Sequence, residues 1–201
     1  MKDLDKNNAS LSPKTQKTYN KIIKYAKKEF ASKGYLNTSI STIAKKASLS
    51  VGCLYKYFSS KDELYSLIIT TEQRQIKEVL NDAIRNVKTR AEKEKVGLRT
   101  WLYYVRDNPG VYKLIWESLF INQKEFDDYY LSFTTSYKSQ LLKSEQTLNT
   151  DDLLNLSYAL VGISNFLGIR IIAEKNKLKD EEIEQMVETG YKLISEGIFK
   201  K

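Results

Sequence analysis

Histidine is absent from this chain of 201 residues, and cysteine, proline and glycine are scarce. Without histidine the chain lacks the commonest general base and the commonest metal ligand, which disfavours an enzyme or a metal centre. The single cysteine excludes an internal disulfide and suits a reducing cytoplasm. Two prolines and eight glycines leave long helices possible almost everywhere and disfavour a turn-rich β fold.

Targeting and catalytic motifs are missing as well. Residues 1–12 show no signal-peptide character, and the most apolar stretch, Leu153 to Ala173, is interrupted by Asn155, Asn165 and Arg170. We therefore expect neither a leader nor a membrane span. There is no phosphate-cradling glycine-rich loop, cysteine cluster or nucleophile motif. We expect no catalytic residue, no metal ligand and no bound cofactor.

Positive charge is concentrated in the first third of the chain. Residues 1–62 hold 13 lysines and four acids, a surplus of nine positive charges. The other 139 residues hold 20 basic and 21 acidic groups and are almost neutral. Such asymmetry indicates a head that binds a polyanion, carried on a neutral body, whereas scattered lysines would only aid solubility.

The first third reads as four helices. Apolar residues repeat at helical spacing from about Thr15, and Gly34 is placed to end that helix. Thr38 or Ser39 can cap a short second helix, and Ser50 a third that extends to Phe58. Ser60 and Glu63 fit a capping box at the start of a fourth helix. Two short helices joined by a tight turn behind a longer helix form a helix-turn-helix pattern.

The remainder reads as helical throughout, over roughly 82–107, 110–120, 123–147, 151–175 and 180–199. We predict an all-α protein whose N-terminal three-helix DNA-binding domain is followed by a larger helical domain for dimerisation and ligand binding. The predicted boundary divides residues 1–62 from residues 63–201.

The stretch TSISTIAKKASLSVGCLYKYFSSKDEL resembles the DNA-binding signature of the tetracycline-repressor (TetR) family. The resemblance covers roughly residues 15–65, about a quarter of the chain. The matching positions are Phe30, Gly34-Tyr35, Thr38, Ile43-Ala44, Ala47, Ser50, Gly52, Leu54-Tyr55, Tyr57-Phe58, Lys61 and Glu63-Leu64. Two positions depart from the common pattern: Tyr57 replaces a frequent histidine, and Cys53 replaces a threonine, serine or asparagine.

The chemistry of this stretch suits a helix in the major groove. Ser50, Val51 and Cys53 are short enough to approach base edges, and Gly52 lets the backbone come close to DNA. Polar groups around them are suited to phosphate oxygens, with Leu54 and Phe58 left to the core. These predicted phosphate contacts are Thr38, Ser39, Ser41, Tyr55, Lys56, Tyr57 and Lys61.

Cys53 has two possible roles. A thiol at a helix N-terminus would have a lowered pKa and could act as a redox sensor. A small groove-facing or half-buried spacer is the simpler interpretation, because no second cysteine could resolve an oxidised thiol within the chain.

Aromatic residues gather in residues 101–137, which hold 11 of the 23 in the chain. They predict either a plain aromatic core or a cavity with an apolar body and a few polar handles. The resemblance implies a small-molecule effector in such a place. Our candidate effector-binding residues are Trp101, Tyr104, Trp116, Phe120, Tyr130, Phe133, Phe166 and Arg170.

Two C-terminal segments predict a homodimer. The segment Leu153 to Ala173 is apolar on nearly every face, so both sides need covering, and the last segment repeats its apolar residues on one stripe. Together they resemble the helix pairs that form a four-helix dimer interface in the family. The candidate interface residues are Gly162, Ile163, Ile183, Val187, Gly190, Ile194 and Ile198.

These features predict a cytoplasmic, homodimeric transcriptional regulator, more readily a repressor than an activator. It would bind a palindromic DNA operator and be released by a small-molecule effector. The alternative is a basic amphipathic adaptor that binds acidic membrane surfaces or proteins through residues 14–33.

Overall fold

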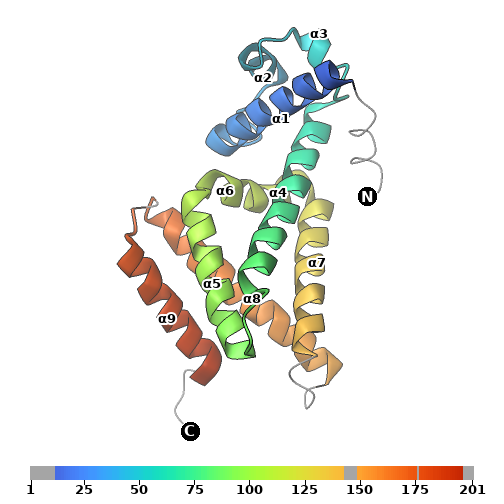
Figure 1. The fold of residues 1–201 in the computed structure, drawn as a ribbon. Coiled ribbons are helices and arrows are strands. Elements are labelled where there is room, and N and C mark those ends of the chain that lie inside the picture. Colours follow the sequence, from blue (N-terminus) through green and yellow to red (C-terminus); the bar gives the residue numbers. More distant parts are fainter. Residues whose placement is uncertain (1–11, 143–148, 176, 197–201) are drawn as a thin grey trace.

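The computed structural model describes residues 12–142, 149–175 and 177–196, and these ranges hold nine α-helices and no strand (Figure 1). The predicted all-α class is confirmed. The N-terminal helices are α1 (Pro13–Lys33), α2 (Ile40–Lys46), α3 (Val51–Leu54) and α4 (Lys61–Ile84). The others are α5 (Arg90–Asp107), α6 (Pro109–Ile121), α7 (Gln123–Leu141), α8 (Thr150–Ala173) and α9 (Asp180–Glu196).

Helix ends follow the capping residues of the sequence. Gly34 ends α1 with a φ of 79°, a left-handed value that glycine adopts at little cost. The side chains of Ser39, Ser50 and Ser60 each accept a hydrogen bond from the backbone N–H three residues later, and so begin α2, α3 and α4. The capping serines proposed from the sequence are therefore correct, but the predicted capping box of α4 is not formed, because the Glu63 carboxylate accepts the N–H of Ser59 and not that of Ser60.

Some helix bounds differ from the prediction. The third helix, expected to reach Phe58, ends at Leu54 and continues as turns. The segment predicted as 82–107 contains a break, because α4 runs to Ile84 and Thr89 opens α5 with a capping box. The predicted ends of the segments 123–147 and 180–199 lie outside the described residues.

The molecule has a head and a body (Figure 1). The head consists of α1, α2, α3 and the first turns of α4, and its buried cluster includes Ile22, Phe30, Leu54 and Tyr65. The body consists of the rest of α4 with α5 to α9, centred on buried residues that include Leu102.

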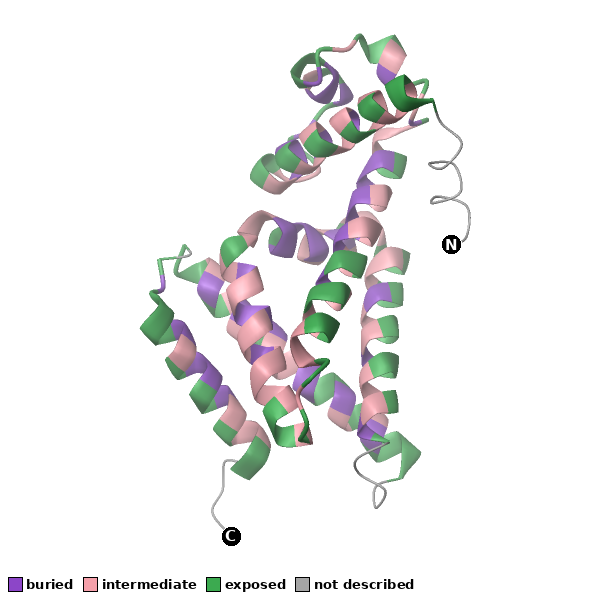
Figure 2. Cartoon of the chain, viewed as in Figure 1, coloured by how far each residue is buried: buried purple, intermediate pink, exposed green. Residues whose placement is uncertain are grey.

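Helix α4 belongs to both parts. Its residues Leu64, Tyr65, Ile68 and Ile69 are buried in the head cluster, whereas Ile76 is buried in the body. Figure 2 shows buried positions along both parts of this helix. The predicted domain boundary after residue 62 thus falls within one continuous helix and stays a prediction. A stiff helix shared by two cores transmits movement of one part to the other.

Candidate nucleic-acid interface and ligand cavity

Helices α2 and α3 are joined by a tight turn at Ser48, Leu49 and Ser50. Ser48 adopts a φ of 56°, a conformation that non-glycine residues rarely take. Leu49 packs against the head cluster, as expected of a residue that fills the angle between two helices. This geometry is that of a helix-turn-helix unit with a serine at the left-handed position.

The outer side of α3 presents short and polar groups to solvent. Val51 is 39% exposed and Tyr55 is 50% exposed, and Gly52 and Lys56 are exposed as well. A Cβ atom added at Gly52 would meet nothing within 4 Å, so the fold itself does not require glycine there. Space beside an exposed backbone is what the close approach of a DNA groove needs.

Buried residues hold α3 against the head from the other side. Leu54 and Phe58 are buried, as predicted, and Phe58 stacks on Tyr19 with ring centroids 5.3 Å apart. Tyr57 packs partly against the same cluster, which leaves it less available to DNA than Tyr55. Cys53 is half-buried, which suits the spacer interpretation better than an open thiol.

Two of the predicted phosphate contacts are engaged within the protein. Thr38 is only 2% exposed, and its hydroxyl donates to the carbonyl of Gly34 at 2.7 Å. The Lys61 ammonium donates to the carbonyls of Tyr35 and Thr38 at 2.9 and 3.0 Å, and lies 3.9 Å from the centroid of the Tyr35 ring. Thr38 is thus corrected from a DNA contact to a structural residue, and Lys61 holds the loop before α2.

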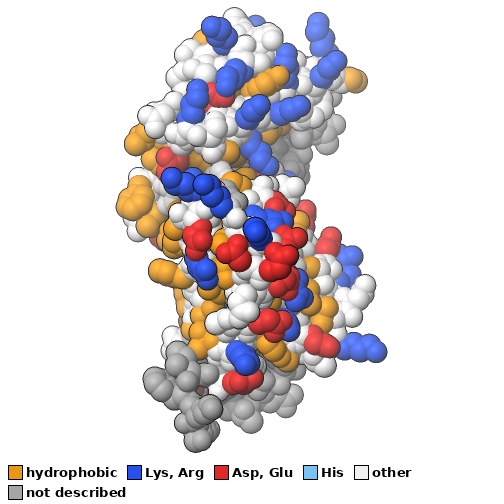
Figure 3. Space-filling model, turned by 90° about the vertical axis from the view of Figure 1, so that its left-hand side faces the viewer, with side chains coloured by type: hydrophobic (Ala, Val, Ile, Leu, Met, Phe, Trp, Pro, Cys, Tyr) orange, Lys and Arg blue, Asp and Glu red, His pale blue; other side chains and the backbone are white. Residues whose placement is uncertain are grey.

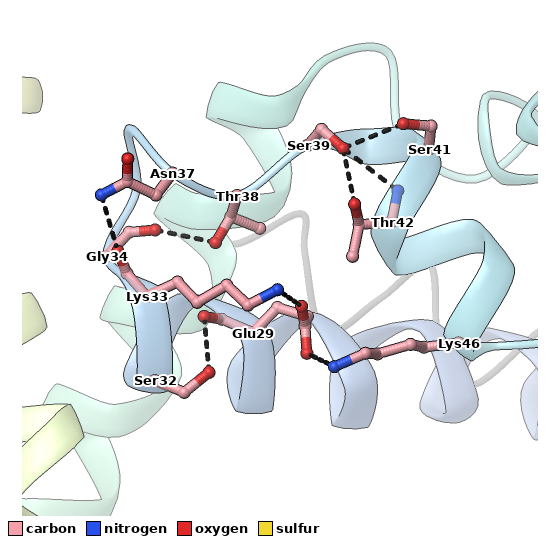
Figure 4. A network of polar contacts seen from close by, with 10 residues as sticks. All are labelled: Glu29, Ser32, Lys33, Gly34, Asn37, Thr38, Ser39, Ser41, Thr42 and Lys46. Carbon is pink, nitrogen blue, oxygen red and sulfur yellow. Dashed lines mark hydrogen bonds and ion pairs between the residues drawn. The ribbon is translucent and has the colours of Figure 1, made fainter.

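The remaining predicted phosphate contacts lie at the start of α2. Ser39 and Ser41 are exposed, and their hydroxyls are 2.9 Å apart (Figure 4). Ser39 also accepts the N–H of Thr42 at 3.1 Å, so its hydroxyl already caps the helix. Ser41 keeps the freer hydroxyl of the two.

A buried carboxylate that the sequence did not single out ties α1 to α2 (Figure 4). Glu29 accepts a hydrogen bond from Lys46, at the end of α2, and its other oxygen lies 3.0 Å from the Lys33 ammonium. The pKa of Glu29 is lowered, chiefly by the hydrogen bond from Lys46 and despite burial, which raises it. This network fixes the orientation of the helix-turn-helix on α1.

Lysines dominate the surface of the head, whereas basic and acidic side chains alternate over the body (Figure 3). The charge asymmetry of the sequence is therefore an asymmetry in space. A polyanion would meet the head first.

The head meets the body at a joint between α1 and α6. A Cβ atom added at Gly110 would lie 2.5 Å from the carbonyl oxygen of Ala31, so only glycine lets the two helices come this close. Glu117 accepts the backbone N–H of Tyr35, with its two oxygens 3.0 and 2.9 Å away. From α4, Tyr65 donates to the carbonyl of Leu114 at 2.9 Å. Movement of α6 must consequently displace the loop that carries α2.

The body holds a partly open cavity of about 130 Å³ between α4, α5, α7 and α8. Three predicted effector residues, Trp101, Tyr130 and Phe133, line it. The Trp101 indole donates to the carbonyl of Ser164 at 2.9 Å, and the Tyr130 hydroxyl donates to the side-chain oxygen of Asn165 at 3.1 Å. Of the two alternatives for the aromatic cluster, a cavity with polar handles is the one found.

The other predicted effector residues lie outside this cavity. Tyr104 packs against Trp101 in the body core, and Trp116 and Phe166 line a separate shallow surface groove. Phe120 is 85% exposed, and Arg170 is exposed and pairs with Glu174 at 3.0 Å. None of these five residues lines the cavity between α4, α5, α7 and α8, and an effector-binding role for them stays a prediction.

Four charged cavity residues were missed because nothing in a helical pattern distinguishes them from solvated surface charges. They are Lys77, Arg90, Lys93 and Glu94. Three cations and one carboxylate give the cavity wall a surplus of positive charge. Asn165, noted only as an interruption of an apolar run, was the one usable signal on α8.

Several residues predicted for the dimer interface are buried within the subunit. Ile183 and Val187 are fully buried against the body of their own subunit, and Gly190 lies close to Leu98. They are corrected to core residues, because α9 uses its apolar stripe to cover α5. Ile194 packs within the subunit too, and Ile198 lies outside the described residues.

An apolar surface remains on α8 and α7. Phe166 is 68% exposed, and Tyr158 and Leu131 are exposed as well. Gly162 lies beside them on the shallow groove, with nothing within 4 Å of an added Cβ atom. Ile163 is half-buried on the same helix. Large exposed apolar side chains in a cluster are typical of an interface.

Helix α8 meets the length and composition of a membrane span, with a mean hydropathy of 1.6, contrary to the expectation of no candidate. A core helix of a soluble protein passes the same test, and α8 packs against α5, α7 and α9. Among the residues that the structure describes, no group of three His, Cys, Asp or Glu is placed to hold a metal ion.

These features define a helix-turn-helix DNA-binding protein with a ligand-sized cavity in its helical body. Residues 22–68 match the model of the family described as bacterial regulatory proteins, tetR family. The match lies in the segment whose motif resembles the same family and covers about a quarter of the chain.

Known proteins resemble the chain over different extents. An uncharacterized HTH-type transcriptional regulator of Mycobacterium tuberculosis, Rv1255c, is 30% identical over 98 residues, which are 49% of this chain and 48% of that protein. The match thus spans about half the length of that relative.

Solved structures share the fold over nearly the whole chain. The fatty acid degradation regulator FadR of Bacillus halodurans superposes with a TM-score of 0.78 at 16% identity, covering 96% of this chain and all of that one. FadR of Bacillus subtilis, solved in complex with stearoyl-CoA, gives a TM-score of 0.75 at 17% identity, covering 90% and 100%. At these identities the likeness concerns the fold.

Proposed function

We propose that the chain is a dimeric, sequence-specific DNA-binding transcriptional regulator, acting as a repressor that a small-molecule effector releases from a palindromic operator. The observation that carries the proposal is the outer side of α3. Gly52 and its exposed neighbours Val51 and Tyr55 have no packing role there, yet they stand on a rigidly capped helix within a lysine-rich head. Residues at such a place are free to read base edges.

Helix α6 contacts both the cavity wall and the head, and so connects the two. Tyr112 of α6 contacts Trp101 of the cavity wall, with ring centroids 5.8 Å apart, and the same helix holds Ala31 and Tyr35 of the head. An effector that prefers one arrangement of the body would shift the population of head positions. Moving the protein from mostly bound to mostly free needs about a 10⁴-fold difference in effector affinity between the two states.

Dimerisation is part of this proposal. A single short helix reads few bases, whereas two copies related by a two-fold axis read a palindrome with half-sites about 34–36 Å apart or a multiple of this. The exposed side chains Phe166, Tyr158 and Leu131 are the apolar surface we assign to the partner subunit. We place the protein in the cytoplasm and assign it no catalytic activity.

Bacillus subtilis FadR, which shares the fold, was solved with stearoyl-CoA. This supports the idea that a helical body of this shape receives a small molecule. The membrane-adaptor alternative is weakened, because the apolar face of α1, with Ile22, Ala26 and Phe30, is buried inside the head. An adaptor helix would need that face for lipid.

The test is selection of genomic fragments by the purified chain, read by sequencing, with Gly52→Ala as the variant. Wild type should recover a palindromic sequence. Gly52→Ala should fold at least as stably, because alanine favours a helix by up to about 1 kcal/mol, but should lose at least about tenfold in operator affinity. Lys113→Gln, on the exposed side of α6, is the control and should bind as wild type does.

Two outcomes would contradict the proposal. One is recovery of random fragments by the folded wild type, and the other is unchanged operator binding by Gly52→Ala. Binding to vesicles of acidic lipid without sequence-specific DNA binding would instead support the adaptor.

A further inference from the structure

The cavity wall holds a lysine without a counter-ion. Lys77 of α4 is half-buried and lines the cavity, and its ammonium donates to the hydroxyl of Ser132, an exposed residue of α7 outside the cavity wall. Within the described part of the chain no carboxylate lies within ion-pair distance of it. Lys77 therefore places a partly desolvated positive charge at the edge of the cavity with no carboxylate paired to it.

The carboxylate of the cavity wall, that of Glu94, is already paired within the protein. Glu94 pairs with Arg90 and accepts a hydrogen bond from the hydroxyl of Tyr137, and the Arg90 guanidinium lies 4.8 Å from the centroid of the Tyr137 ring. The charges of Arg90 and Glu94 balance each other, although the buried Arg90 Nε has no hydrogen-bond partner among the described residues. They leave Lys77, together with Lys93, as the unpaired positive charges of the wall.

Apolar side chains make up a large part of the remaining wall. Leu80, Leu98, Trp101 and Phe133 face the same space, and Phe133 also lies beside the Lys77 ammonium, 5.9 Å from it to the ring centroid. One cation at the edge of an aromatic hollow is complementary to a molecule with one negative charge next to an apolar body.

The volume sets the size of the apolar part that can sit inside this partly open cavity. About 130 Å³ is close to the engineered 150 Å³ cavity that binds benzene. A ring or a short branched chain fits such a space.

We propose that the cavity binds a compact amphiphilic carboxylate, with its apolar body against Trp101 and Phe133 and its carboxylate on the Lys77 ammonium. This inference rests on the proposed function in taking the cavity as the effector site. It adds the chemical class of the effector and the residue that selects it. Burial lowers the pKa of Lys77, and a bound carboxylate would favour its charged form again.

The test is calorimetric titration of the full chain, without DNA, with three probes of one shape. They are 3-phenylpropionate, the neutral 3-phenyl-1-propanol and the cationic 3-phenylpropylamine. The carboxylate should bind at least about tenfold more tightly than the alcohol, because a charge-assisted hydrogen bond forms in a partly desolvated site. The amine should bind most weakly. Equal affinities for carboxylate and alcohol, or tighter binding of the amine, would overturn the proposal.

Variants assign the preference to one side chain. Lys77→Gln should remove the preference for the carboxylate while leaving the affinity for the alcohol within about twofold, and Lys77→Arg should keep the preference. Lys113→Gln, outside the cavity, is the charge-matched control and should behave as wild type. A preference that persists in Lys77→Gln refutes the assignment. If Lys77→Gln does not fold, the three probes on wild type decide alone.

A last arm separates the free acid from its activated form. The coenzyme A thioester of the same acid has no carboxylate at that position, so it should gain nothing from Lys77. The proposal is overturned if the thioester binds more tightly than the free acid and the Lys77→Gln variant binds the thioester as tightly as wild type does. Because no DNA is present, a failure here leaves the regulator proposal standing, whereas a failed operator selection leaves the ligand result intact.

Discussion

Lys61 shows how a single residue of a DNA-binding motif acts from inside the protein. Its ammonium donates to two carbonyls in the segment between α1 and α2, and one of them, that of Tyr35, also accepts the backbone N–H of Thr38 at 3.2 Å. The sequence favoured a phosphate contact because Lys61 stands in the first turn of a helix. Its place in the motif is explained as well by the loop that it holds.

Replacing Lys61 tests the two roles. Lys61→Met should lower the free energy of unfolding by about 1–3 kcal/mol, because hydrogen bonds from a charged group are lost. The slope of log operator affinity against log salt should stay within half a unit of wild type. A slope lower by about one unit, with stability unchanged, would restore the phosphate contact.

Glu29 makes the head sensitive to acid. Its folded-state pKa is lowered, chiefly by Lys46, so the stability that it contributes is present above its unfolded pKa and is lost as pH falls through the folded value. Glu29→Gln should cost about 1–2 kcal/mol at pH 7, and the difference from wild type should shrink below about pH 4. Urea unfolding at pH 7 and pH 3 measures this. Glu78→Gln, on the exposed side of α4, should show no such pH dependence.

Among the helices, α6 is the element whose position has the widest consequences. It lies across the end of α1, receives the hydroxyl of Tyr65 and holds the N–H of Tyr35 through Glu117. Close approach at Gly110 sets this geometry. A helix that touches both the head and the cavity wall is the natural carrier of a signal between them.

A methyl group at Gly110 should disturb that helix. Gly110→Ala should destabilise the fold by about 1–3 kcal/mol, because the new Cβ atom would lie against a backbone oxygen that cannot step aside. Operator affinity should fall too, through the displaced head. Gly97→Ala is the control, since its Cβ would meet only Ile84 at 4.0 Å. Thermal unfolding and operator titration of both variants give the comparison, and equal behaviour would show that the joint tolerates movement.

At the scale of the whole molecule, the charge of the head and the exposed apolar surface of α8 suit two different kinds of partner. In our proposal, the lysine-rich head binds DNA and the apolar surface around Phe166 binds a second subunit. Charge acts at long range and sets the rate of encounter, while apolar burial acts at contact and sets its lifetime.

Phe166→Glu tests the assembly. The variant should remain folded, because this side chain is exposed in the subunit, but should weaken dimerisation at least about tenfold by placing two carboxylates in an apolar contact. Sedimentation velocity over a range of concentrations measures the dissociation. Leu36→Glu introduces the same charge at an exposed leucine of the head and should leave the dimer intact. A monomeric wild type would contradict the assembly itself.

The sequence by itself determined the helical class, the caps and the head. Scarce proline and glycine permit long helices, capping serines act within one turn, and the pattern around Leu54 and Phe58 is local enough to be read along the chain. Trp101, Tyr130 and Phe133 were found because aromatic residues gather in the sequence as well as in the cavity.

Contacts between residues distant in the chain needed the tertiary structure. The pairing of Lys61 with the Tyr35 and Thr38 carbonyls joins residues more than 20 positions apart, and no local pattern encodes it. The apolar stripe of α9 gave no sign whether α5 or a second subunit would cover it, because both offer the same apolar burial. Lys77 likewise reads as a surface charge until α7 is folded beside it. The charge distribution and the hydrophobic periodicity of the sequence identify the helices, but only the packing of the helices decides which of their faces stay exposed.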